Sequence, residues 1–331
     1  MDYFCDSFFF LESVFGVSIK IIFIDPQSRL NQSYVELRSD YELKIGINLS
    51  IDNDRDYKAA LIKQLKIFEE VKFDNVEISP NCSGIIKNGS LDKRECSNLL
   101  NILSSYRFSY TVHAPDEMNL VSPLLLKISE KVMKSCIDLC VMLDADVLVV
   151  HSGYITPADK MSEPEALRIL VGSLKKWGRY ARDSGVLIGV ENGDPCPTHL
   201  CKEVDKLIDV VRNVNMDSVG ITFDVGHAFL SASYYKFNFL EAVRNVVSYM
   251  IHVHLHDNFG EFDPLSPGKK NITFGYGDLH MPIGWGKIPY KEVFRLIKEG
   301  YKRELYLLEI DPKFKEYYGY AVAKLKEMLS S

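Results

Sequence analysis

From residue 44 onward, short apolar runs alternate with longer stretches that have the spacing of amphipathic helices. One such run, Val147–His151, is apolar almost throughout and is followed by a helical pattern over 163–184. A continuous apolar run of this length is typical of a strand buried on both faces of a parallel sheet. The alternation therefore predicts parallel strand–helix–strand units along most of the chain.

The same pattern predicts eight strands, at 44–49, 75–79, 110–113, 147–151, 186–191, 219–224, 250–256 and 305–309. The predicted helices span about 55–71, 92–104, 123–143, 163–184, 201–213, 239–247 and 315–329. Eight such units favour an α/β fold of the (β/α)8 TIM-barrel type over residues 44–331. An open doubly wound sheet is the alternative, but no Gly-x-Gly-x-x-Gly motif follows the first strand.

Residues 1–43 precede the first predicted strand and contain two apolar runs, Phe8–Leu11 and Ile19–Ile24. Both runs are shorter than the roughly 18 residues that a membrane-spanning helix needs. Acidic residues surround the first run, whereas a secretory leader begins with positive charge. We expect this segment to be an extension of uncertain order outside the barrel, and we hypothesise that translation starts downstream of Met1.

Charge and cysteine content narrow the class of partner. The net charge is −6, which makes nucleic acid a less favoured ligand and gives no reason to expect a membrane surface. The seven cysteines are odd in number and lack C-x-x-C spacing, so we expect free thiols in a reducing cytoplasm. Cys136 and Cys140 lie one helical turn apart and are predicted to be buried. The expected ligand is a small molecule, and a homo-oligomer is left open.

Histidines and carboxylates gather where the predicted strands end. In a parallel barrel these carboxyl ends carry the functional residues. Seven of the eight histidines lie at strand ends or in the loops that follow, and only His199 looks incidental. Converging polar groups inside an apolar barrel need a partner, and a divalent cation such as zinc or manganese supplies one. The candidates are Glu77, His113, His151, Glu191, Asp224, His227, His252, His254, His256, Asp278, His280 and Glu309.

Spacing refines the roles within this set. Asp224 is placed on a strand, and His227 just past a turn at Gly226. Side-chain alternation puts His252, His254 and His256 on one face of the seventh strand. Of these three we expect the middle one to reach the metal, the first to be structural and the last to lie behind the ligands.

The irregular stretch 257–287 is long enough to be functional. It carries Asp278 and His280, which can join the site only if this loop folds back over the rim. Trp285 in the same loop is predicted either to cover the site or to pack onto the barrel.

Seven motifs together resemble the xylose isomerase-like barrel superfamily, which includes sugar epimerases and the endonuclease IV family. The resemblance covers about residues 44–329 and rests on the order of the motifs. They are Thr111–Pro115 with Asn119-Leu120, Val150–Gly153, Gly189–Asn192, Phe223–Ala228, His252–Asn258, Asp278–Gly286 and Leu308-Glu309.

The epimerase branch implies one metal ion with four ligands and two catalytic glutamates. The ligands correspond to Glu191, Asp224, His254 and Glu309. By this resemblance, Glu191 and Glu309 move a proton at the carbon next to a metal-polarised carbonyl. The chain departs from ketohexose epimerases at Pro197 and Gly260, where a substrate-binding glutamate and arginine are expected. The sugar specificity of that branch is therefore not carried over.

The endonuclease IV branch implies three zinc ions and nine ligands. The additional five correspond to His113, His151, His227, Asp278 and His280. An aromatic residue expected after the third-strand histidine is replaced by Asp116, and an acidic side chain is unfavourable against a phosphate backbone.

We interpret the sequence as a divalent-metal-dependent sugar or sugar-phosphate isomerase or epimerase that holds one to three ions. The alternative is a trinuclear-zinc phosphodiesterase acting on abasic-site DNA. A third interpretation is a non-enzymatic barrel that binds a ligand or stores metal. The predicted substrate contacts are Asn48, Glu77, His256 and Trp285, and His227 is predicted to contact a substrate oxygen or a second ion.

Overall fold

The computed structural model describes residues 43–51, 56–80 and 84–330. Residues 43–331 form a compact unit. The predicted extension, except for Leu43, lies outside the described residues, so its order and its separateness stay predictions. No helix in the described ranges is both long and apolar enough to cross a membrane.

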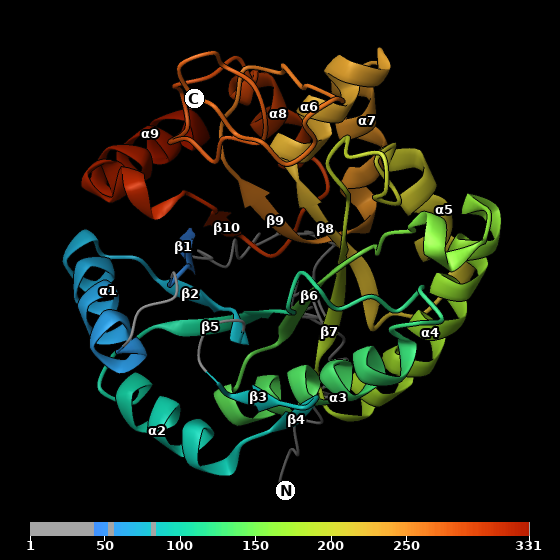
Figure 1. The fold of residues 1–331 in the computed structure, drawn as a ribbon. Coiled ribbons are helices and arrows are strands. Elements are labelled where there is room, and N and C mark those ends of the chain that lie inside the picture. Colours follow the sequence, from blue (N-terminus) through green and yellow to red (C-terminus); the bar gives the residue numbers. More distant parts are fainter. Residues whose placement is uncertain (1–42, 52–55, 81–83, 331) are drawn as a thin grey trace, which may run out of the picture. The chain divides into compact units, whose positions relative to one another are not determined.

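Eight parallel strands close into a barrel in the order β1-β10-β9-β8-β7-β6-β5-β2, which confirms the predicted (β/α)8 fold. Figure 1 shows the strands as a central ring with helices around it. The barrel strands are β1 (Lys44–Leu49), β2 (Asn75–Ile78), β5 (Ser109–His113), β6 (Val147–His151), β7 (Leu187–Glu191), β8 (Val219–Asp224), β9 (Met250–Leu255) and β10 (Leu305–Leu308). The first four residues of β6 are completely buried, as expected for a strand covered on both faces.

The helices that cover the strands are α1 (Tyr57–Val71), α2 (Lys93–Leu103), α3 (Leu126–Leu143), α4 (Glu163–Asp183), α5 (Val204–Val214), α6 (Val225–Tyr235), α7 (Phe239–Val246), α8 (Tyr290–Ile297) and α9 (Tyr318–Ser330). Short 3₁₀ turns lie at Pro157–Asp159, Val247–Tyr249 and Pro312–Tyr317. All seven predicted helices are present, with ends shifted by a few residues.

Three elements are not among the predicted ones: α6, α8 and a small hairpin of β3 (Ile86–Lys87) and β4 (Ser90–Leu91). Helix α6 has no clear polar face, because small and apolar residues cover most of its surface. It also starts at the residue after β8, so no loop separates the two patterns. Helix α8 is only eight residues long and follows the long irregular loop.

The strand register already pairs several polar side chains at one rim. His151 at the end of β6 lies opposite Glu191 at the end of β7. A register shift between Ile221 and Thr222 brings Asp224 on β8 opposite His254 on β9. Adjacent positions in neighbouring strands lie about 5 Å apart, so backbone pairing alone puts these side chains in contact.

The five described cysteines are free. Cys136 and Cys140 on α3 are completely buried, as predicted. Burial raises the pKa of the Cys136 thiol to about 12, which keeps it protonated and unreactive. These thiols belong to the packing between helix and barrel.

Candidate metal centre

Four side chains from three neighbouring strands and the residue after β10 converge at the rim. The Nδ1 atom of His254 lies 3.3 Å from Glu191 Oε1, 3.2 Å from Glu309 Oε2 and 4.0 Å from Asp224 Oδ2. One ligand atom from each of the four residues lies within 4.8 Å of the others. We call Glu191, Asp224, His254 and Glu309 the inner group.

The inner group has the unsatisfied oxygens that a bound cation would satisfy. Asp224 Oδ2 and Glu309 Oε2 are buried and accept no hydrogen bond. Buried polar atoms without a partner are costly and rare. Two oxygens that face one imidazole nitrogen form a mixed donor set that suits zinc or manganese. The residues therefore fit one divalent ion.

A second group lies on the other side of Glu191. The Nε2 atoms of His113 and His151 lie 3.2 and 3.3 Å from Glu191 Oε2. His113 also hydrogen-bonds the main-chain oxygen of Ala114 through Nδ1, at 2.7 Å, so that its Nε2 faces the carboxylate. Glu191 thus divides its two oxygens between the inner group and this histidine pair.

A third group, which we call the loop-side group, contains His227, His256, Asp278 and His280. Asp278 Oδ2 lies 3.5 Å from His227 Nε2 and is hydrogen-bonded to His280 Nε2. The Nδ1 atoms of His227 and His280 face the main-chain oxygens of Asn192 and Glu309, at 3.1 and 3.0 Å. Such contacts orient imidazoles in metal sites, because they leave Nε2 for the ligand.

The loop-side group exists because the loop after β9 folds back over the rim. Asp257 and Met281 pair as an isolated antiparallel bridge, with main-chain bonds of 2.8 and 3.1 Å. The Asp257 carboxylate accepts backbone N–H bonds from Asn258 and Gly284, both at 2.9 Å. His280 has a left-handed backbone with φ of 46°, a conformation that non-glycine residues adopt mainly where the surroundings enforce it.

The prediction of a glycine turn between Asp224 and His227 is wrong. Residues 225–227 form the first turn of α6, and Asp224 caps that helix by accepting the His227 backbone N–H at 2.6 Å. Gly226 serves packing instead of a turn. A Cβ atom at this position would lie 2.0 Å from Cε1 of His256, so only glycine lets that ring pack against the helix.

All nine predicted ligands thus come together in three adjoining groups, and their metal binding stays a prediction. Of the predicted substrate contacts, Asn48 and Glu77 line a cavity at the rim. His256 is completely buried and stacks on His280, with 4.1 Å between the two ring centroids. Trp285 packs against Phe314 and Tyr317. Neither His256 nor Trp285 lines the two described cavities, so their role as substrate contacts finds no support.

Charge coupling holds the site in ionic form. Burial opposes ionisation of Glu191, but His254, His113 and His151 hold the pKa of this carboxyl well below its usual range. Burial likewise opposes protonation of His113, yet Glu191 raises the pKa of the imidazole to about 10. Without metal, His113 and Glu191 therefore form a pair of imidazolium and carboxylate. A bound ion must displace protons, because only neutral imidazoles coordinate.

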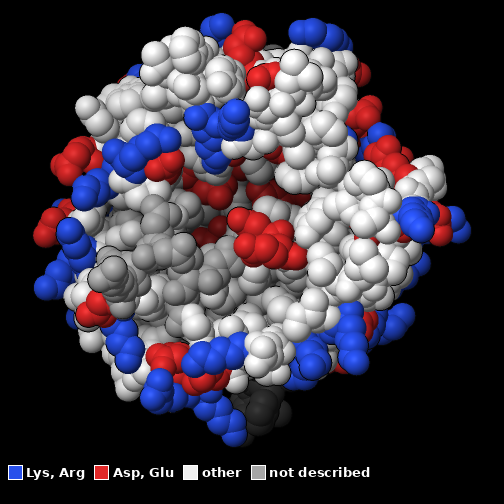
Figure 2. All heavy atoms as spheres, viewed as in Figure 1, with Lys and Arg blue, Asp and Glu red and all other residues white. Residues whose placement is uncertain are grey.

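The three groups border one cavity of about 500 Å³. Figure 2 shows acidic side chains in and beside the hollow on this face, with Lys and Arg mainly toward its periphery. Lys270 is the only lysine or arginine among the described residues that line it, and its Nζ lies 3.5 Å from Asp278 Oδ2. A polar, metal-compatible cavity of this volume matches a small-molecule site.

Part of the cavity wall is absent from the predicted site, which left His199 out as incidental. Asp194 and His199 line the cavity, and His199 Nδ1 is paired with an oxygen of Asp194. Together with Cys196 they form a further cluster of metal-compatible side chains. The available signal was their position in the loop after the fifth strand, where functional residues of a barrel lie.

The family model for the xylose isomerase-like TIM barrel matches residues 65–328. The chain belongs to this family. An uncharacterized protein of Methanocaldococcus jannaschii is 30% identical over 243 residues, covering 72% of this chain and 75% of the relative. A probable endonuclease 4 of Mesomycoplasma hyopneumoniae is 26% identical over 192 residues, covering 56% of this chain and 63% of the relative. A D-tagatose 3-epimerase-like protein of known crystal structure is 25% identical in sequence, with a TM-score of 0.66. The match covers 87% of this chain and 97% of that protein's chain.

Proposed function

We propose that this protein is a divalent-metal-dependent isomerase or epimerase of a sugar or sugar phosphate. The observation that carries the proposal is the placement of Glu191 and Glu309, which both contact His254 Nδ1 and both line the cavity. Their strands are separated in the ring by β8 and β9, so the carboxylates approach from different sides. The likeness to the D-tagatose 3-epimerase-like structure supports this assignment.

The chain's own groups suit proton transfer next to a carbonyl. A divalent ion bound by the inner group would polarise that carbonyl and so acidify the neighbouring carbon. The side chain of Glu309 is 18% exposed and lines the cavity, so its oxygen that does not bind the ion would be available to remove a proton. Glu191 would give a proton back to that carbon from the other side. His113 and His151, which lie next to Glu191 Oε2, could then supply Glu191 with a new proton. Asn48, Lys270 and His199 provide polar contacts in the cavity wall.

The charge of the cavity mouth favours a small molecule over DNA. The side chain of Asp116 is 68% exposed and lies 4.0 Å from His151 Nε2. It lines the cavity together with Asp194 and Asp311. Three acidic side chains where a duplex would approach oppose the counterion-driven binding on which nucleic-acid affinity depends.

Phosphodiester hydrolysis is a second candidate, and two observations favour it. Glu191 places one oxygen toward the inner group and the other toward His113 and His151, so both oxygens would be available to hold ions. Asp278 Oδ1 in the loop-side group is also buried without a hydrogen-bond partner. Sites with several ions serve phosphoryl chemistry. In that arrangement Glu191 has no oxygen left to act as a base.

Metal content and proton exchange together test the two candidates. Purified protein is saturated with manganese or zinc, desalted and analysed for metal, then incubated in D₂O with ketoses, aldoses and their phosphates. One ion per chain, with deuterium entering next to the carbonyl of one sugar, supports the isomerase or epimerase. Three ions, with incision of an abasic-site duplex and no deuterium uptake, overturn it in favour of the nuclease. Glu299→Gln, an exposed surface change, is the matched control for Glu309→Gln.

A further inference from the structure

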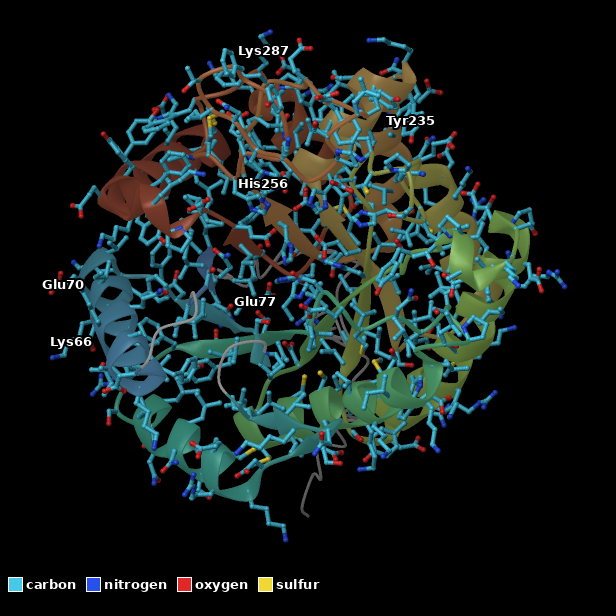
Figure 3. All side chains as sticks on the ribbon, viewed as in Figure 1. Lys66, Glu70, Glu77, Tyr235, His256 and Lys287 are labelled. Atoms are coloured by element: carbon cyan, nitrogen blue, oxygen red, sulfur yellow. The ribbon has the colours of Figure 1, made fainter. Side chains whose placement is uncertain are left out.

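Glu77 is a carboxylate inside the barrel that the proposed chemistry does not use. It lies on β2, its side chain is 2% exposed, and it faces β9 across the barrel interior. Figure 3 shows it inside the ring of strands, whereas Glu70 lies on the outer side of α1. Burial opposes ionisation of Glu77, but His254 and His252 hold the pKa of this carboxyl well below its usual range. A buried negative charge of this kind needs a structural or functional reason.

The two oxygens of Glu77 are engaged by three side chains. Oε2 accepts a hydrogen bond from Thr111 Oγ1 at 2.9 Å and contacts His252 Nε2 at 3.1 Å. Oε1 lies 3.0 Å from His254 Nε2, a buried nitrogen that has no hydrogen-bond partner of standard geometry. His252 and His254 are completely buried. Thr111 and His252 therefore fix the carboxylate, and its remaining oxygen faces one nitrogen of the candidate ligand.

This contact makes His254 differ from three of the other candidate histidine ligands. In His113, His227 and His280, Nδ1 faces a main-chain oxygen and Nε2 faces the carboxylates. In His254 the order is reversed. Its Nε2 faces Glu77, and its Nδ1 faces Glu191 and Glu309. A carboxylate behind an imidazole orients the ring and selects which nitrogen carries the proton.

We propose that Glu77 is a positioning residue: it holds His254 with the proton on Nε2, so that Nδ1 is the nitrogen that binds the ion of the inner group. The inference rests on the proposed metal centre and adds to it the identity of the ligand atom. The substrate contact predicted at Glu77 stays a prediction beside this role, since Glu77 also lines the smaller of the two cavities. Loss of such a carboxylate typically lowers metal affinity by about 10–100-fold.

The experiment measures binding of zinc and cobalt(II) to the full chain carrying Glu77→Ala or Glu77→Gln. The second variant keeps the shape of the side chain and guards against loss of folding in the first. Glu70→Gln changes an exposed glutamate near the end of α1 and is the matched control. We expect about 10–100-fold weaker binding for Glu77→Ala, a smaller loss for Glu77→Gln and no change for the control.

Two spectroscopic readouts separate positioning from a merely structural role. The visible spectrum of bound cobalt(II) should change in both Glu77 variants. Imidazole ¹⁵N shifts of zinc-loaded wild-type protein should show His254 protonated at Nε2 and bound at Nδ1. Zinc on Nε2, or unchanged affinity and spectrum in folded variants, overturns the positioning role and leaves the metal centre standing. Wild-type protein that binds neither metal overturns both.

Discussion

The inner group and the loop-side group reach the same cavity by different routes. Three of the four inner residues lie on strands, and Glu309 directly follows one. In the loop-side group, His227 lies in the first turn of α6, and Asp278 and His280 lie in a loop held by Asp257. Glu191, Asp224 and His254 are at most 1% exposed, and the side chain of Glu309 is 18% exposed. In the loop-side group the side chains of His227, Asp278 and His280 are 13–14% exposed, and His256 is completely buried. The contrast therefore lies in the backbone that carries the side chains, not in burial alone.

This difference separates a rigid part of the site from an adjustable one. Strand positions are set by hydrogen bonding on both sides, so the backbone that carries these side chains is held in place. A loop held by a short main-chain bridge and the Asp257 carboxylate can change at less cost than a barrel strand, and loops carry most variation in function on a common scaffold. We expect the inner group to determine whether chemistry occurs and the loop-side group to determine which substrate is accepted.

The largest effect is expected from the inner group. Glu309→Gln keeps the size of the side chain but removes the free oxygen proposed as the base. Turnover of the identified sugar should fall by about 10²–10⁴-fold, measured by steady-state kinetics at saturating metal. Glu299→Gln should leave turnover unchanged. Wild-type turnover in Glu309→Gln would remove Glu309 from the mechanism.

The loop-side group should behave differently. His280→Ala removes a side chain that lines the cavity and contacts Asp278. We expect the Michaelis constant for the sugar to rise about 10-fold, the value of a lost hydrogen bond to a charged group, with one bound ion retained. Loss of an ion in metal analysis of this variant would instead place a second ion in the loop-side group and favour phosphodiester hydrolysis.

The contact between α6 and the loop-side group can be tested through glycine. Gly226→Ala places a methyl group within 2.0 Å of the His256 ring, and we expect a loss of about 1–3 kcal/mol in the free energy of unfolding. Gly172→Ala on α4, where nothing lies within 4 Å, should stabilise by about 0.5–1 kcal/mol. Denaturant unfolding measures both. If Gly226→Ala and Gly172→Ala change the free energy of unfolding equally, the His256 ring can move aside.

The last prediction concerns the metal-free protein and pH. The pKa of His113 rises from 6.5 to about 10 on folding, so its contribution to stability is complete below pH 6.5 and is lost as pH rises toward 10. The pKa of Glu191 is lowered from 4.5, so its contribution is present above pH 4.5 and is lost as the pH falls. Chelator-treated protein should therefore be most stable between about pH 4.5 and 6.5. His113→Gln should flatten the alkaline decline in unfolding experiments, and an unchanged decline would assign it to other groups.

Much of this architecture could be predicted because local patterns report on strands and helices. The runs 147–151 and 219–224 match β6 and β8 residue for residue. Helix α6 could not be found in this way, since buried small residues leave it without a polar face. The order of histidines and carboxylates along the strands likewise predicted which side chains share the rim, because parallel strands end on the same side of a barrel.

The sequence by itself determined the barrel and the polar side chains at its carboxyl rim, since both depend on short-range periodicity. Only the tertiary structure decided how those side chains divide. The register shift in β8 pairs Asp224 with His254, the bridge from Asp257 to Met281 returns the loop to the rim, and Glu77 meets His254 across 177 positions of the chain. Such contacts arise from the closure of the barrel, and no local pattern encodes which distant residues closure brings together.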